Sequence, residues 1–129
     1  MENTSIKIFV FGSNLAGFHG RGAAAAARII YGARNGVGFG RTGNAYAIPT
    51  KDEKLRRLPI RQIRKFVEAF IRYAKDNPEL NFFVTEIGCG LARYEPRDIA
   101  PLFFGAPPNC QLPKKFIEVH ANIQSKMLV

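Results

Sequence analysis

The chain has 129 residues, of which 47% are hydrophobic, enough for a folded domain with a real core and too many for a disordered chain. Its 19 lysines and arginines outnumber 10 acidic residues, and the formal net charge of +9 favours anionic partners such as nucleotides, nucleic acids or acidic protein surfaces. No apolar run approaches the roughly 20 residues that span a bilayer, and no signal peptide is evident, so we expect no membrane association.

The first half of the chain predicts two buried strands joined through a helix and a loop. Residues 6–11 are β-branched and aromatic and end at glycine, which is typical of a fully buried strand. Residues 19–31 contain five successive alanines and predict a helix that packs closely against a sheet and stops at Gly32. Residues 33–43 hold four glycines and are expected to form an exposed loop. Residues 45–48 predict a second strand, which Pro49 stops.

The second half begins with the clearest helix, at residues 59–76. Apolar residues recur there at i, i+3, i+4 and i+7, and Pro59 suits the first helical position. The opposite side of this helix is basic and carries Arg61, Arg64, Lys65, Arg72 and Lys75. Beyond it we expect a central strand at 80–87, a short helix at 96–104, a short strand at 109–112 and a terminal helix from Pro113.

This alternation of strands and helices predicts an α/β fold. We expect one domain, residues 1–129, with three layers (α/β/α) around a mostly parallel sheet. In such sheets, ligands bind outside the carboxyl ends of the strands. Two glycine-rich segments fall there: residues 12–22 follow the first strand, and residues 87–94 follow the strand at 80–87. Glycines and helix N-termini bring backbone N–H groups close to anions, so the two segments predict a crevice for a diphosphate or nucleotide.

Three strings of residues resemble the macro domain. Asn14 and residues 19–24 resemble its first ligand loop, and Ile-Gly-Cys-Gly-Leu at residues 87–91 is closest to the branch that contains terminal ADP-ribose protein glycohydrolase. Residues 46–51 resemble that branch's strand, which ends in a lysine. The resemblance covers residues 6–104, and the whole chain also resembles small uncharacterised proteins of phages and bacteria.

The resemblance implies a macro-like fold, a site for ADP-ribose or a related nucleotide, and a role for each matching residue. Asn14 would contact the distal ribose, and Lys51 would attack the ribose carbon. The ligand's phosphates and ribose would be lined by Gly20, Gly22 and Ala23 on one side and by the backbone of Gly88, Cys89, Gly90 and Leu91 on the other. Where the branch has a catalytic aspartate, this chain has Ala92.

Glu86 is the one acid in the strand at 80–87, and an unpaired buried carboxylate is costly. We therefore expect it to face the crevice or a cation, either Lys51 or Arg21. It is then either an acid/base catalyst beside Lys51 or a structural ion-pair partner. Lys51 itself is either a partly desolvated nucleophile or a solvated loop lysine.

Other candidate ligand contacts lie in the loops at the same end. His19 is placed to touch a ribose or phosphate. Tyr94 either contacts a ribose or base, or packs beneath its loop. Arginines suit bidentate phosphate contacts, or are simply solvated. The arginines concerned are Arg21, Arg34, Arg41 and Arg93.

Since the sequence gives no sign of secretion, we expect a cytoplasmic protein whose two cysteines are reduced thiols rather than a disulfide. Cys89 is either a nucleophile or a small buried residue. Neither cysteine has zinc-ligand spacing with His19 or His120, so the sequence implies no metal and no cofactor.

Three functions remain open from the sequence. The first is binding of ADP-ribose or a related nucleotide diphosphate, with hydrolysis of an ADP-ribose linkage through Lys51 and Glu86. The second is a non-catalytic module that binds or sequesters a nucleotide in phage–host conflict, which Ala92 favours. The third is nucleic-acid binding through the basic helix. An ADP-ribosylated protein or nucleic acid is the expected macromolecular partner, and the oligomeric state stays open.

Overall fold

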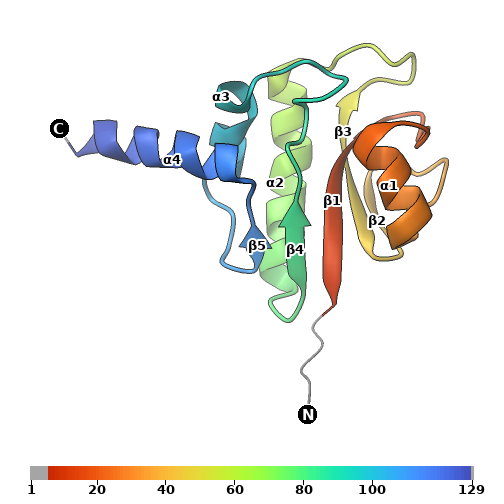
Figure 1. Ribbon diagram of the computed structural model, residues 1–129, viewed down its shortest axis with the longest axis horizontal. Coiled ribbons are helices and arrows are strands. Elements are labelled where there is room, and N and C mark those ends of the chain that lie inside the picture. Colours follow the sequence, from red (N-terminus) through yellow and green to blue (C-terminus); the bar gives the residue numbers. More distant parts are fainter. Residues whose placement is uncertain (1–5, 129) are drawn as a thin grey trace.

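The computed structural model describes residues 6–128 and shows an α/β fold (Figure 1). In chain order the elements are β1 (Lys7–Asn14), α1 (Gly22–Tyr31), β2 (Gly40–Thr42), β3 (Ala45–Lys51), α2 (Ile60–Asp76), β4 (Asn81–Val84), α3 (Pro96–Ile99), the 3-10 helix η1 (Ala100–Phe103), β5 (Cys110–Gln111) and α4 (Lys114–Met127). The strands form one sheet in the order β2-β3-β1-β4-β5, and only β2 runs antiparallel. The predicted α/β fold with a mostly parallel sheet is confirmed.

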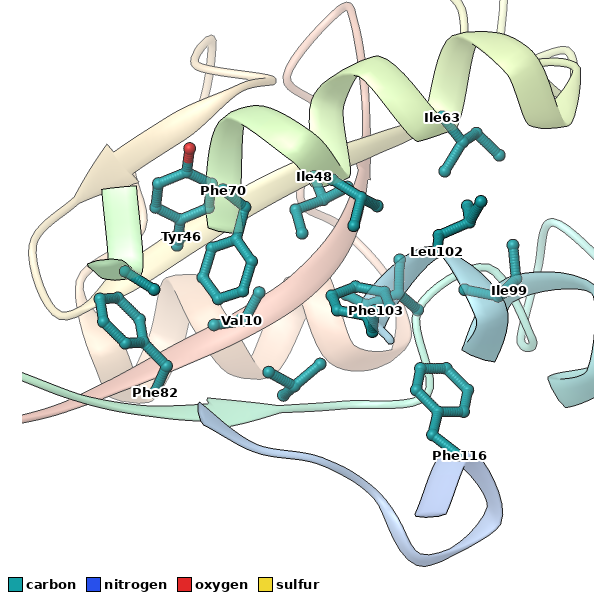
Figure 2. Close-up of a cluster of buried hydrophobic side chains, with 14 of the residues drawn as sticks. Val10, Tyr46, Ile48, Ile63, Phe70, Phe82, Ile99, Leu102, Phe103 and Phe116 are labelled. Carbon is teal, nitrogen blue, oxygen red and sulfur yellow. The ribbon is translucent and has the colours of Figure 1, made fainter. Parts of the chain in front are cut away.

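The larger core lies between the sheet and α2 (Figure 2). Residues of α2 at a helical spacing, Ile63, Val67, Phe70 and Ala74, have no exposed surface. They pack against the strand residues that point to this side, and η1 and the first turn of α4 close the end of the cluster. The apolar periodicity of residues 59–76 therefore reflects a real buried face.

The opposite face of the sheet carries α1, and its core is built from small residues. Ala24 and Ala27 of α1 pack against Ala45, Ala47 and Phe11 of the strands. Alanine side chains let the helix lie close to the sheet, as the run of five alanines predicts. Gly32 ends the helix in a left-handed conformation (φ 78°), where glycine avoids the steric cost that a Cβ brings.

Two strands run further than their turn residues suggest. β1 continues through Gly12 to Asn14, and β3 continues through Pro49 to Lys51. The register between the two strands slips by one residue at this point, so that Ser13 faces Pro49 and Asn14 faces Lys51. Such an irregularity tolerates a residue without an N–H, which is why Pro49 does not stop the strand.

Other boundaries also differ from those expected. The glycine-rich segment at 33–43 contains β2, which pairs with β3 as an edge strand. The helix expected from residue 19 begins at Gly22, and Pro59 caps α2 instead of starting it. The strand expected at 80–87 ends at Val84, which leaves residues 85–87 in the loop beyond the sheet.

β1 lies at the centre of the sheet, between β3 and β4. The chain leaves β1 toward β3 and later returns to the other side of β1 as β4. Parallel sheets bind ligands where the strand order reverses in this way, outside the carboxyl ends. The loops that follow β1, β3 and β4 gather along that edge of the sheet (Figure 1). No helix within residues 6–128 is long and apolar enough to cross a membrane.

Candidate functional site

A cleft of about 740 Å³ opens at the carboxyl ends of β1, β3 and β4. Ligand sites typically measure roughly 300–1,000 Å³, so its size suits a small organic molecule. Both glycine-rich segments contribute to its wall, as does the end of β3. The lining residues are Gly12, Ser13, Asn14, Phe18, Gly20, Arg21, Gly22, Ala23, Ala24, Thr50, Lys51, Leu55, Thr85, Glu86, Gly88, Cys89, Gly90, Leu91 and Ala92.

One wall of the cleft is the N-terminus of α1. The cap residue Arg21 is extended, makes no side-chain capping bond, and no acid lies in the first turn. The first N–H groups of a helix have no partner inside it, and the helix dipole adds partial positive charge at this end. A Cβ at Gly20 or Gly22 would meet no atom within 4 Å. This wall therefore offers open, unneutralised N–H donors to an anion.

The opposite wall is the loop that follows β4. Gly88 is left-handed (φ 77°) and close to β1: a Cβ at Gly12 would lie 3.4 Å from the Gly88 nitrogen. Within residues 6–128, the backbone N–H groups of Gly88, Gly90 and Leu91 donate no hydrogen bond. These residues line the same cleft as the α1 N-terminus, so residues with unpaired N–H groups line it from both glycine-rich segments.

Cys89 differs from its neighbours in this loop. Its amide donates to the Glu86 carbonyl (3.0 Å), so the expectation that it offers its N–H to a phosphate is wrong. Burial raises the pKa of its thiol to about 11, and the Glu86 carboxylate adds to the effect. A thiol with so high a pKa is a poor nucleophile at neutral pH, so the structure favours the small, half-buried role for Cys89.

Lys51, at the end of β3, and Glu86, in the loop after β4, both line the cleft, and β1 lies between their two strands. Lys51 is half-buried and its carbonyl accepts the Leu15 amide (2.9 Å), which ties the end of β3 to the loop after β1. Glu86 is exposed. The ion pairs of residues 6–128 do not include Glu86, so its predicted salt bridge with Lys51 or Arg21 is absent from this part of the chain.

Asn14 lines the cleft, but its side chain is occupied. Its amide nitrogen donates to the Phe18 carbonyl and its oxygen accepts the Phe18 amide, both at 2.9 Å. The role that the resemblance implies, a ribose contact, would compete with these bonds. In the structure Asn14 instead fixes the turn that presents Phe18.

His19 does not reach the cleft, so the expected contact with a ribose or phosphate is wrong. The ring is buried against Phe11 and hydrogen-bonds to the Val37 carbonyl through Nε2 (3.0 Å). Its backbone bonds to Asn35 and Arg28, so the residue ties the start of α1 to the loop before β2. Nδ1 is buried without a hydrogen-bond partner in residues 6–128.

Tyr94 and Arg93 follow the cleft-lining segment 88–92 and are not among the lining residues. The Tyr94 hydroxyl donates to the Leu58 carbonyl (2.6 Å), and the Arg57 guanidinium stacks 4.2 Å from the ring centre. Tyr94 therefore packs beneath its loop and joins it to the start of α2. Arg93 is exposed and left-handed (φ 65°), and its amide closes a turn on Gly90.

Of the other loop arginines, only Arg21 lines the cleft. Arg41 belongs to β2 and bonds to the Gly43 carbonyl and the Tyr73 hydroxyl. Arg34 is exposed outside the cleft, where its amide bonds to Thr42. The expectation that these two arginines lie at the ligand end is wrong because the loop that carries them turns back into an edge strand.

Two apolar residues of the cleft, Phe18 and Leu55, were not predicted from the sequence. Phe18 and Leu55 are large, exposed and part of the lining, and Thr50 of β3 is a buried residue of the same lining. A lone phenylalanine among glycines was the available signal for Phe18. Leu55 gave no signal, because it stands in a charged loop whose fold depends on Asp52.

Comparisons with protein families, with curated proteins and with solved structures find no match to this chain. The functional assignment therefore rests on the cleft itself. No group of three or more His, Cys, Asp or Glu side chains within residues 6–128 is placed to hold a metal ion.

Proposed function

We propose that the protein binds ADP-ribose or a related nucleotide diphosphate in the cleft, with the phosphates between the two glycine-rich segments. One observation carries the proposal: the uncapped N-terminus of α1 lines one cleft together with Gly88, Gly90 and Leu91, whose N–H groups make no hydrogen bond within residues 6–128. Backbone donors converging from two sides suit the several oxygens of a diphosphate better than a single carboxylate.

The charges around the cleft support an anionic ligand. Arg21 and Lys51 line it, Glu86 is the one acid that lines it within residues 6–128, and the whole chain carries a formal charge of +9. A positive field raises the local concentration of anions and speeds their association. The basic side of α2 lies outside this lining, so nucleic-acid binding through α2 would leave the cleft unexplained.

Hydrolysis of an ADP-ribose linkage is the second candidate function. It is supported by Lys51 and Glu86, a possible nucleophile and a possible acid/base, lining the cleft that holds the donors. The substrate would be an ADP-ribosylated protein or nucleic acid. Ala92 is buried in the cleft wall and supplies no second acid. If the protein does not hydrolyse the linkage, it acts as a non-catalytic nucleotide-binding module. In either case we propose a cytoplasmic role, which the two free cysteines support.

Calorimetric titration of ADP-ribose into the wild type and Gly20→Glu tests the binding proposal. Position 20 has open space for a side chain and no left-handed backbone, and an acid beside a helix N-terminus does not weaken the helix. The new carboxylate should repel the phosphates and lower the affinity by more than about tenfold. Gly22 is a poorer choice, because its left-handed backbone (φ 56°) would strain any side chain.

The matched control is Gly105→Glu. Gly105 is also open and free of left-handed strain, but lies outside the cleft, and the variant carries the same change in net charge. Its affinity for ADP-ribose should stay within about twofold of the wild type. Equal losses in both variants would assign the effect to net charge, and no binding by the wild type would refute the proposal.

A further inference from the structure

We propose that three exposed apolar side chains at the mouth of the cleft, Phe18, Leu55 and Leu91, hold the nucleobase of the bound nucleotide without reading its identity. We call these three residues the apolar rim. The inference rests on the proposed function, since the phosphates between the glycine-rich segments would bring the base to the rim. The backbone donors account for the phosphates of the ligand, and the apolar rim accounts for its base.

The rim comes from three separate loops around one cleft. Phe18 precedes α1, Leu55 follows β3 and Leu91 follows β4, and each lines the cleft. Their exposed fractions are 64%, 48% and 57%, so none of them contributes much to the core. The glycines form the polar part of the same cleft. A ligand with an anionic part and a flat apolar part matches this division.

The fold holds Phe18 in place although the side chain is exposed. The Asn14 carboxamide bonds to both the N–H and the carbonyl of Phe18. The backbone that carries this exposed ring is therefore fixed before the ligand arrives, which lowers the backbone entropy that binding costs.

Leu55 is held at a conformational cost. It is one of two left-handed non-glycine residues in the described chain (φ 63°), and the other, Arg93, immediately follows the cleft-lining segment 88–92. The Asp52 carboxylate accepts the amides on either side, Lys54 and Arg56, and its carbonyl accepts the Leu55 amide. Backbone strain of this kind persists where the surrounding structure enforces it, and it clusters at functional sites.

Leu91 sits on a third fixed turn, closed by the bond from the Arg93 amide to the Gly90 carbonyl (3.0 Å). All three rim side chains are hydrocarbon, with no hydrogen-bond donor or acceptor. Stacking and apolar contact accept any base, because every base has a flat face. The rim therefore predicts that the protein tolerates different bases.

Calorimetry with ADP, GDP, UDP and inorganic pyrophosphate tests this inference. For the wild type we expect the three nucleotides to bind within about tenfold of one another and each about tenfold or more tighter than pyrophosphate. In the double variant with Phe18→Ala and Leu55→Gly, the nucleotides should bind no tighter than pyrophosphate, whose own affinity should not change.

Two controls separate binding from folding. Glycine relieves the left-handed strain at position 55, so Leu55→Gly alone should not lower the melting temperature. Phe104→Ala removes a 43% exposed phenylalanine outside the cleft and should leave all affinities unchanged.

A preference among the bases above about tenfold, or unchanged ADP affinity in the double variant, would overturn the inference. If either of these two results is obtained while pyrophosphate binds the wild type and Gly20→Glu abolishes that binding, only the apolar rim is refuted and the proposed function stands. If neither pyrophosphate nor any nucleotide binds the wild type, the proposed function and the inference fall together.

Discussion

Phe70→Ala is expected to lower the free energy of unfolding by about 3–5 kcal/mol, which is a large part of the stability of a domain this size. Phe70 has no exposed surface, and its ring centre lies 5.0 Å from that of Tyr46 and 5.3 Å from that of Phe82 (Figure 2). Removing the ring leaves a cavity between α2 and the sheet, and the neighbouring side chains cannot move far enough to fill it. Urea unfolding followed by circular dichroism measures the change.

The same substitution at Phe18 is the control. Phe18 is 64% exposed, so Phe18→Ala should cost less than about 1 kcal/mol. A loss at Phe70 no larger than the loss at Phe18 would contradict the assignment of the main core to the α2 face of the sheet.

Lys51→Ala is expected to abolish turnover, with a loss of at least about 100-fold, in any assay in which the wild type releases ADP-ribose from an ADP-ribosylated substrate. Among the described residues, Lys51 is the one lysine that lines the cleft, and it lies at the carboxyl end of β3. The affinity for ADP-ribose should stay within about threefold, because the proposed phosphate contacts come from backbone amides. Product release followed by chromatography, with calorimetry in parallel, measures both quantities.

Lys51→Arg distinguishes a nucleophile from a charge. Arginine keeps the positive charge but stays protonated and cannot attack a ribose carbon, so this variant should also be inactive. Activity restored by arginine would assign Lys51 an electrostatic role, and full activity of Lys51→Ala would remove Lys51 from the mechanism.

The sequence predicted the core of the fold better than the ends of its elements. The apolar periodicity of α2 and the short apolar runs of β1 and β3 are dictated by which side chains must be buried. Their ends depend on tertiary pairing instead. β1 passes through Gly12 and β3 through Pro49 because the two strands pair with each other, with a slipped register that neither sequence displays alone.

For the candidate site too, the sequence predicted the location better than the details that depend on tertiary contacts. That both glycine-rich segments lie at one edge of the sheet follows from strand order, and the structure brings both into one cleft. Side-chain roles were harder to predict, because they depend on partners distant in the sequence. His19 is held by Val37, 18 residues away, and Tyr94 by Leu58, 36 residues away. No local pattern reveals that these polar groups already have structural partners.

The most direct test of the central claim is a titration of ADP-ribose followed by two-dimensional 1H–15N NMR of the full chain. We predict that the largest chemical-shift changes occur at the backbone amides of residues 20–24 and 88–92, the two walls of the cleft. Amides on the basic side of α2, from Arg61 to Lys75, should not move. Changes confined to α2, or no changes at saturating ADP-ribose, would contradict the assignment of the cleft as a nucleotide diphosphate site.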